Sequence, residues 1–376
     1  MGYIHLMNQV CERCVMDTSD TAITFDDNGI CGHCKNAYEL NKSIQHNLKN
    51  YSFELVIQNI KNNNSDSKYD GIIGLSGGLD SSYVALKVVE AGLRPLVVHV
   101  DGGWNSDIAV RNVRSIVETL GLSLVTKVIN WSEMRDLQIA YLKSGIANQD
   151  VPQDHAFFSM LYKVAAEHKI STVITGSNIA TESVLPKSWE YDAMDGRHVK
   201  SIAKEFHTKL NDFPVLTLPR YYGEHVLLRR MKVIRPLNHL EYVRDDAINE
   251  LGQKIGWKDY GGKHRESLFT DWFQHSYLLR RLGIDKRKAH LSSLVMSNQI
   301  SRDQALREIA ENPLSVQEEK RLTEFVCRKL GVSGNDLQNW IIQPERSYND
   351  FRNDEKLIKY LSSLKVITRL RRVVGA

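Results

Sequence analysis

Apolar and polar positions follow two alternating periods from residue 69 to residue 178, and this pattern predicts the centre of the fold. Strand-like runs occur at 71–75, 95–100, 122–129 and 172–175. Between them, apolar residues recur at helical spacing over 82–91, 107–120, 132–142 and 155–167. Strands and helices in alternation favour a parallel sheet covered by helices on both faces, so we expect an α/β, doubly wound fold.

The remaining patterns divide the chain of 376 residues into four parts. Residues 1–36 hold four cysteines and form an N-terminal module. Residues 37–68 contain a predicted helix over 37–61 and a linker rich in Asn, Ser and Asp. We expect the nucleotide-binding domain over 69–240, and a helical region over 241–376 that completes the active site.

Composition narrows the class of protein without naming a function. Hydrophobic residues make up 42% and charged residues 25% of the chain, which is ordinary for a soluble globular protein. The sequence contains neither an apolar run long enough to span a membrane nor a signal-peptide pattern at Met1, so we expect a cytoplasmic protein. A net charge of +4 is too mild to require a nucleic-acid partner.

The cysteines form two pairs, Cys11 with Cys14 and Cys31 with Cys34, and each pair has the Cys-x-x-Cys spacing. Thiolates at this spacing can reach one tetrahedral ion, so we expect a structural Zn²⁺ site. The missing secretory signal disfavours disulfides. An iron–sulfur cluster or a redox-active cysteine pair stays open as the alternative.

The segment over 76–82, Ser-Gly-Gly-Leu-Asp-Ser-Ser, lies between a predicted strand and a predicted helix. In that arrangement backbone N–H groups turn toward an anion, and glycines let phosphate approach closely. We expect a phosphate-binding loop in which Asp80 holds Mg²⁺ and the other contacts come from Ser76, Gly77, Gly78, Ser81 and Ser82. The alternative is an ordinary glycine turn. The pattern resembles the pyrophosphate loop (PP-loop) of the ATP pyrophosphatases, which cleave ATP between its α and β phosphates.

Two more polar groups follow predicted strands at the same edge of the sheet, where ligands bind in such folds. Asp101 follows the second strand, and Gly176 and Asn178 follow the fourth. We expect all three near the nucleotide. Asp101 and Asn178 are also typical turn formers, which is the alternative for each.

The stretch over 181–198 loses periodicity and is rich in aromatic and acidic residues, as functional loops often are. Trp189, Tyr191, Asp192 and Asp195 would suit a sugar ring and its hydroxyls. A solvated loop is the alternative.

Charged residues gather again in two later blocks. The first contains Lys263 and Glu266, and Asp271, Gln274 and His275 follow it on a predicted helix. The second contains Lys286, Arg287 and Lys288 beside His290. Cations are needed where pyrophosphate is expelled, so we expect Lys263, Lys286 and Arg287 near the phosphates. The alternative for the second block is a solvated basic helix end.

These blocks carry a more specific resemblance over nearly the whole chain. It resembles the N-acetyl sugar amidotransferases that build acetamidino sugars for lipopolysaccharide O-antigen or flagellin glycans. The resemblance rests on the four cysteines, the segments 75–82, 175–178, 236–238, 256–257, 260–267 and 285–292, and Thr181 with Glu182. It implies that ATP adenylates the N-acetyl oxygen of a sugar, which we expect to be nucleotide-linked or a nonulosonate, and that ammonia then replaces that oxygen.

The residue types suit this chemistry. Lys263 and Lys286 are expected to stabilise charge on the phosphates, and Glu266 to accept a proton from ammonia. A glutaminase nucleophile is missing from the sequence, and Gly2 stands where an N-terminal nucleophile would need cysteine. The resemblance therefore implies a separate glutaminase and a cyclase-like subunit that passes ammonia, similar to those of histidine biosynthesis.

Two other functions remain to be distinguished from this one. A tRNA-modifying enzyme of the thiolation type would share the fold, but the modest charge and the lack of interleaved basic and aromatic residues disfavour it. A non-enzymatic adaptor built on a zinc knuckle is disfavoured by the intact Asp80 and loop serines.

Overall fold

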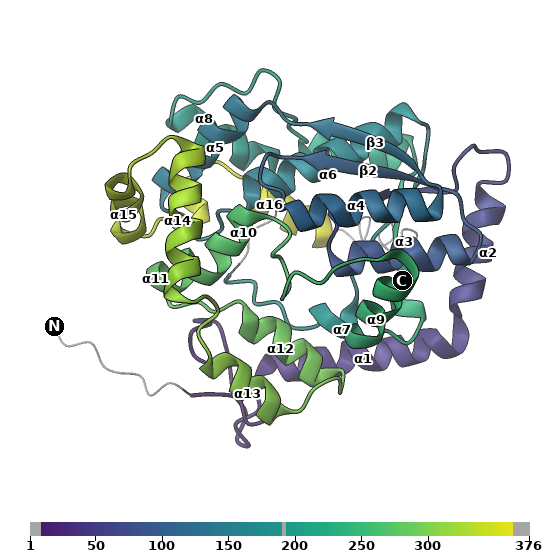
Figure 1. The fold of residues 1–376 in the computed structure, drawn as a ribbon, viewed down its shortest axis with the longest axis horizontal. Coiled ribbons are helices and arrows are strands. Elements are labelled where there is room, and N and C mark those ends of the chain that lie inside the picture. The colour runs from purple at the N-terminus through teal and green to yellow at the C-terminus, as the bar shows by residue number, and fades with distance from the viewer. Residues whose placement is uncertain (1–8, 190–192, 364–376) are drawn as a thin grey trace.

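The computed structural model describes residues 9–189 and 193–363, and a five-stranded parallel sheet lies at its centre (Figure 1). The strands are ordered β3-β2-β1-β4-β5. Their bounds are β1 Gly71–Gly74, β2 Pro95–Asp101, β3 Ser123–Val128, β4 Thr172–Ile174 and β5 Lys232–Ile234. The chain builds outward from β1 to β3 and then returns to β4 on the other side of β1. The strand order therefore reverses between β1 and β4, where open α/β sheets bind ligands.

Helices cover both faces of the sheet, because neighbouring strand residues point to opposite sides. Ile72, Leu96 and Val98 pack into one core with α5, α6 and α8, whereas Ile73 and Val97 pack into another with α2, α3, α4 and α9. The flanking helices are α3 Leu79–Glu90, α4 Asp107–Leu120, α5 Trp131–Ser144, α6 Val151–Glu167, α8 Gly196–Glu205 and α9 Arg244–Ile255. The predicted doubly wound α/β fold is confirmed.

The single helix predicted over 37–61 is wrong, because the chain forms two helices there. These are α1 Gly32–Asn50 and α2 Phe53–Asn63. Ser52 adopts an extended conformation between them, and its side chain accepts a hydrogen bond from the Leu55 N–H at 3.3 Å. Serine favours such an N-cap, so the break has a local cause. The start of α1 at Gly32 also places Cys34 in its first turn.

One strand was missing from the predicted set. β5 has only three residues, which are exposed or half-buried, so it lacks the apolar run that predicts a buried strand. It pairs with β4 through Lys232 with Thr172 and Ile234 with Ile174. Short elements connect the last strands: α7 Ile179–Glu182, a π-helix η1 Pro219–Leu228 and a 3₁₀ helix η2 Pro236–His239.

The region after α9 is helical, as predicted. Its elements are α10 Leu268–Trp272, the π-helix η3 Phe273–Tyr277, α11 Leu278–Leu282, α12 Arg287–Met296, α13 Arg302–Ala310, α14 Val316–Leu330, α15 Gly334–Ile342, η4 Tyr348–Asp350 and α16 Glu355–Ser363. Phe269, Trp272 and Val326 form a third core together with Trp104 and the cysteine module. Within the described ranges, no helix is both long and apolar enough to cross a bilayer.

The cysteine module is attached to this helical region. Arg302, at the start of α13, donates hydrogen bonds to the carbonyl oxygens of Cys11 and Cys14 at 2.8 and 3.2 Å. The Val15 N–H donates to Ser292 Oγ on α12 at 3.2 Å. In Figure 1 the first described residues accordingly lie beside α12 and α13, far along the chain from them.

Candidate active site

The serine–glycine loop joins β1 to α3 and lies at the reversal point of the sheet. Gly77 has φ +83°, and a Cβ there would lie 2.4 Å from the carbonyl oxygen of Ala109, so this position requires glycine. Ser76 Oγ accepts a hydrogen bond from the Gly78 N–H at 3.1 Å, and Gly78 is the N-cap of α3. The loop therefore brings backbone N–H groups and the start of a helix to one place, as an anion site requires.

The loop serines differ in what they can contact. Ser76 and Ser81 line a recess of about 190 Å³ above the loop, and their hydroxyl oxygens lie 3.2 Å apart. Ser82 is fully buried and donates to the Gly78 carbonyl at 2.6 Å. Ser82 therefore stabilises the first turn of α3 in this structure, whereas Ser76 and Ser81 face the space where phosphate would lie.

Residues from the second half of the chain hold the loop in place. The Trp257 indole N–H donates to the Gly77 carbonyl at 3.1 Å, and Asn112 donates to the same oxygen at 3.3 Å. The Leu79 N–H donates to the Tyr260 hydroxyl at 3.2 Å. The loop is thus completed by side chains that no local pattern around residues 76–82 could predict.

Asp80 stands at the centre of a polar network beneath the loop. Its Oδ1 accepts hydrogen bonds from the Tyr242 hydroxyl at 2.5 Å and from the Asn178 amide at 3.2 Å. A Cβ on Gly176 would lie 2.4 Å from the Asp80 carbonyl oxygen, so glycine permits this close approach. Burial raises the pKa of Asp80, and the neighbouring Lys263 ammonium opposes that shift.

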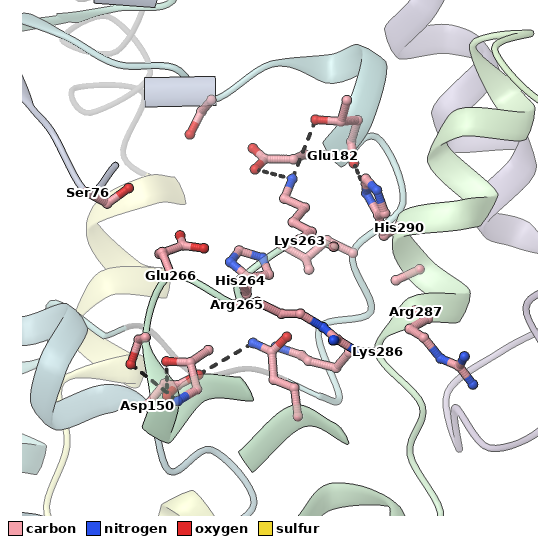
Figure 2. Close-up of a pocket in the computed structure, with 18 of the residues that line it drawn as sticks. Ser76, Asp150, Glu182, Lys263, His264, Arg265, Glu266, Lys286, Arg287 and His290 are labelled. Atoms are coloured by element: carbon pink, nitrogen blue, oxygen red, sulfur yellow. Dashed lines mark hydrogen bonds and ion pairs between the residues drawn. The ribbon is translucent and has the colours of Figure 1, made fainter. Parts of the chain in front are cut away.

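Lys263 lies between two carboxylates. Its Nζ is 2.8 Å from Glu182 Oε1 and 3.5 Å from Asp80 Oδ2 (Figure 2). Burial alone would lower the pKa of Lys263, but Glu182 and Asp80 raise it above its usual value, so the ammonium is retained. Glu182 had no predicted role, although the segment that contains it is one of those carrying the resemblance.

The donor set around Asp80 suits a Mg²⁺ ion. Asp80 and Glu182 converge on one cation, the Lys263 ammonium, and hard divalent cations prefer such carboxylate oxygens. Both carboxylates border the recess above the loop. These two residues are therefore the ones that could hold Mg²⁺ beside the phosphates.

The segment that carries Lys263 has an unusual backbone. His264 has φ +66°, which is strained for a residue with a side chain. The other described non-glycine residues with positive φ each follow a helix end: Lys169, His207, Arg230 and Asn298. His264 follows none, and strain of this kind concentrates at functional sites. The result is that Lys263, His264, Arg265 and Glu266 all line one cavity.

Glu266 faces the loop from this segment. A Cβ added to Gly78 would lie 3.1 Å from Glu266 Oε1. Its Oε2 is buried and makes no hydrogen bond with any residue that the structure describes. Burial raises the pKa of Glu266, so the carboxylate is a stronger base than an exposed one.

The main cavity has a volume of about 1180 Å³ and extends from the loop to the C-terminal helices. Its wall opposite Glu182 is polar (Figure 2). Asp150 accepts hydrogen bonds there from Thr270 Oγ1 at 3.0 Å and Gln274 Nε2 at 3.4 Å, and Asn148 lines the same wall. Beside the loop, Val98, Val100, Phe157 and Leu161 form an apolar part of the lining. The cavity thus has an anion-binding end, an apolar part and a polar wall.

Two of the other predicted nucleotide contacts have structural roles here. Asp101 Oδ1 accepts from the Gly103 N–H at 2.8 Å and from Asn105 at 3.2 Å, which makes it a turn former. Asn178 is buried; it contacts Asp80 and caps α7 by accepting from the Thr181 N–H at 3.0 Å. Asn178 therefore positions Asp80 and does not line the cavity.

The basic block after residue 283 also separates into different roles. Lys286 lines the cavity near Arg265 (Figure 2). Arg287 borders the cavity, but its guanidinium is paired with Asp285 at 2.7 Å and donates to the carbonyls of Glu308 and Glu311. Lys288 pairs with Asp17 of the cysteine module. These three side chains therefore do not form the freely solvated basic helix end that was the alternative prediction.

Two of the residues in 181–198 that were predicted to contact a sugar are buried and have structural roles instead. Trp189 is 3% exposed and belongs to the core shared by the cysteine module and the C-terminal helices, so it offers no ring face to a ligand. Asp195 is 1% exposed; it caps α8 and accepts hydrogen bonds from Tyr348 and from the Asp354 N–H. Tyr191 and Asp192 lie outside the described residues.

The four cysteines form a closed cluster. Their sulfur atoms all lie within 4.8 Å of one another, and three of the pairs are 3.7 Å apart. Four thiolates around Zn²⁺ at about 2.3 Å have sulfur–sulfur edges of about 3.8 Å. The N–H groups of Arg13 and Cys31 donate to Cys11 Sγ at 3.4 and 3.2 Å, as is suited to a thiolate. The donor set fits a structural Zn²⁺ ion.

Comparison with known proteins gives one family match. Residues 266–365 match the model of the C-terminal domain of the WbpG-like LPS biosynthesis proteins. This segment contains Glu266, Thr270, Gln274 and Lys286, which line the cavity. The search of curated proteins found no match.

Several solved structures overlap with the chain at low similarity. The NH3-dependent NAD synthetase from Campylobacter jejuni is 18% identical with a TM-score of 0.30, over 57% of this chain and 93% of that one. The NMN synthetase from Francisella tularensis is 19% identical with a TM-score of 0.28, over 57% and 99%. The glutamine-dependent NAD+ synthetase from Acinetobacter baumannii is 12% identical with a TM-score of 0.31, over 80% and 48%. We transfer none of their activities to this chain.

Proposed function

We propose that this protein is an ATP-dependent amidotransferase that converts the N-acetyl group of a sugar into an acetamidino group. The observation that carries the proposal is a cavity joined to the recess above the loop, which together have two unlike ends and share Ser76, Lys263 and Glu266 in their linings. One end has the glycine loop, Asp80 and Lys263, which suit phosphates and a metal ion. The other has hydrogen-bonding side chains around Asp150, which suit a polyhydroxylated ligand. The volume of about 1180 Å³ exceeds a usual single-ligand pocket.

In the first step, the acetamido oxygen attacks the α phosphorus of ATP. The new bond is O–P, the bond to the bridging oxygen breaks, and pyrophosphate leaves with that electron pair. The N–H and hydroxyl donors of the loop and Lys263 would stabilise the leaving charge, which is the main demand of phosphoryl transfer. Mg²⁺ held by Asp80 and Glu182 would neutralise phosphate charge.

The second step uses ammonia. The acetamide carbon now carries AMP, a good leaving group, whereas the original amide carbonyl was a poor electrophile. Ammonia forms a C–N bond, the C–O bond breaks, and AMP leaves with the former acetamide oxygen. We propose that the ammonia comes from a separate glutaminase through a cyclase-like subunit, as the family resemblance implies, since the sequence has no Gly-x-Cys-x-Gly nucleophile segment.

The polar wall, and not the segment around Trp189, is our proposed sugar site. Asn148, Asp150, Thr270 and Gln274 offer both donors and acceptors, as sugar hydroxyls and an amide require. Lys286 lies near this wall and would suit an anionic group on the sugar, consistent with a nucleotide-linked sugar or a nonulosonate. The match to WbpG-like LPS biosynthesis proteins supports a role in surface polysaccharide synthesis.

An isotope experiment tests the proposal directly. The protein is incubated with ATP, Mg²⁺, ammonium chloride and diacetamido sugars whose acetyl oxygens carry ¹⁸O. We expect pyrophosphate, an amidine product and ¹⁸O in the AMP, because only attack by the acetamide oxygen transfers that atom. ADP as the product, or AMP formed only when tRNA is added, would contradict the proposal, and the second result would favour a tRNA-modifying enzyme.

A further inference from the structure

An aspartate–histidine pair, of which the histidine lines the cavity, has no role in the steps above. Asp271 lies on α10 and His275 on η3, and His275 Nδ1 is 2.7 Å from Asp271 Oδ1. An ionised carboxylate accepts from Nδ1–H, which leaves the lone pair on Nε2. His275 Nε2 has no hydrogen-bond partner among the residues that the structure describes, and the ring borders the cavity. This is the arrangement of an oriented histidine base.

The helix is distorted at this pair. η3 is a π-helical turn over Phe273–Tyr277, inserted between the regular helices α10 and α11. Phe273 and Tyr277 are buried in the C-terminal core, whereas Gln274 and His275 line the cavity. Single π-helical turns are often found at functional sites, where they change the direction of a side chain. The extra residue in this turn lets the helix fill the core and still present a histidine to the cavity.

The pair is also connected to the strained segment. Arg265 Nε lies 3.5 Å from Asp271 Oδ1, so the carboxylate is held by a cation on one side and by His275 on the other. His264 is close enough for the His275 charge to affect it. Asp150 lies on the same wall through its hydrogen bond with Gln274. His275 therefore stands on the sugar side of the cavity, whereas Glu266 contacts the phosphate loop.

We propose that His275 is the base that takes a proton from ammonia as it adds to the adenylated acetamide carbon, and that Asp271 is the residue that positions it. The inference rests on the proposed function. The nitrogen lone pair forms the C–N bond, one N–H proton passes to His275 Nε2, and the C–O electron pair leaves with AMP. The strongly basic amidine then takes this proton back and leaves as a cation, which restores neutral His275.

This assignment changes the expected role of Glu266. Adenylation of the acetamide oxygen makes its N–H acidic, and Glu266 faces the loop where that reaction occurs. Glu266 is then the acceptor for the acetamide proton in the first step, and His275 for the ammonia proton in the second. The two side chains should therefore affect different half-reactions.

Single-turnover reactions separate the two steps, with enzyme in excess over the sugar. Pyrophosphate release reports adenylation, and amidine formation reports ammonia addition. For His275→Gln we expect a normal burst of pyrophosphate with amidine formation slowed about 10²- to 10³-fold, a usual range for loss of a general base. For Glu266→Gln we expect the burst itself to slow. His46→Gln, on the exposed face of α1, is the matched control.

Asp271→Asn provides a second variant with a readout that a packing defect would not give. At a fixed concentration of free ammonia, the wild-type amidation rate should fall toward low pH, because a protonated base cannot accept the proton of ammonia. The charged groups that share its surroundings are Asp271, Arg265, His264, Asp150 and Lys286. Asp271→Asn should move this fall to lower pH, because the amide carries no charge to stabilise the imidazolium beside it.

The outcomes are distinguishable. Normal amidine formation by His275→Gln, or an equal slowing of both steps in both His275→Gln and Asp271→Asn, would overturn the role of His275. Failure of the wild type to release pyrophosphate with any acetamido sugar would instead overturn the proposed function. A loss confined to amidine formation supports the inference.

Discussion

The two ends of the cavity are built in different ways. The phosphate end comes mostly from one continuous segment, Ser76–Ser82, whose conformation is set by a strand, a glycine with φ +83° and a helix start. The polar wall is assembled from Asp150 and from Thr270 and Gln274, which are 120 and 124 residues away in the chain. The first is a local motif that tertiary contacts hold in place; the second exists only after the C-terminal helices have packed. The difference teaches that the predicted phosphate loop can be located from the sequence, whereas the proposed sugar site becomes visible only in the fold.

The largest expected effect is at the phosphate end. Asp80→Asn keeps the hydrogen bond from Tyr242 but removes the charge that pairs with Lys263 and would hold Mg²⁺. We expect sugar-dependent AMP formation to fall about 10³-fold, in the range seen when a charge-stabilising group is lost. Steady-state AMP assays measure this. Asp101→Asn is the matched control, since its carboxylate serves a turn. An equal fall in AMP formation there would show that the effect of Asp80→Asn does not come from its position beside Lys263.

The next effect is on the free energy of unfolding. It tests whether the cysteine module supports the C-terminal helices that carry part of the polar wall. Cys34→Ser, or removal of the metal with a chelator, should lower the free energy of unfolding by about 4 kcal/mol or more, as loss of a structural metal does. The cysteine module packs on α12 and α13 through Ser292 and Arg302, so the helical region should unfold earlier. Thermal unfolding with metal analysis measures this. Unchanged stability in a protein that carries no zinc would contradict a structural metal site.

A smaller effect should be specific to the polar wall. Gln274→Ala removes one donor to Asp150 and one group that we propose contacts the sugar. We expect the KM for the sugar to rise about tenfold, which corresponds to the loss of about one hydrogen bond, with the KM for ATP unchanged. Initial-rate kinetics with each substrate varied in turn measure both. An equal rise in both values would show that the two ends of the cavity are not separate sites.

The smallest effect is expected at Asp101. Asparagine can accept the same hydrogen bond from the Gly103 N–H, so Asp101→Asn should change stability by no more than about 0.5 kcal/mol and leave the KM for ATP unchanged. Equilibrium unfolding and initial rates measure these. A clear rise in the KM for ATP would show that Asp101 contacts the nucleotide after all, and that the phosphate end includes residues outside the loop.

Local patterns were sufficient for much of the sheet. The runs at 71–75 and 95–100 are continuous and apolar because β1 and β2 are buried on both faces, and this is the sequence property that parallel strands share. β5 lies at the edge of the sheet and lacks such an apolar run, so the sequence did not predict it. The break between α1 and α2 depends on one N-cap, Ser52, within an otherwise helical pattern.

The site was predictable only where residue type alone fixes the chemistry. Lys263 and Asp80 were expected near phosphates, and the structure brings them within 3.5 Å of each other. Trp189 was misassigned, since an aromatic residue in an aperiodic segment has the same sequence pattern whether it faces a ligand or a core. Glu182 and Asp150 carried no pattern of their own, because their significance comes from what the fold places opposite them.

The hydrogen bonds from the second half of the chain to the loop have a consequence for synthesis. Trp257 and Tyr260 lie 180 and 181 residues after their partners Gly77 and Leu79. A nascent chain can therefore complete most of the sheet while its phosphate loop still lacks these two contacts, together with Lys263 and Glu266. ATP cleavage should begin only after the chain has been translated past this segment, so unfinished polypeptides on the ribosome would not consume nucleotide.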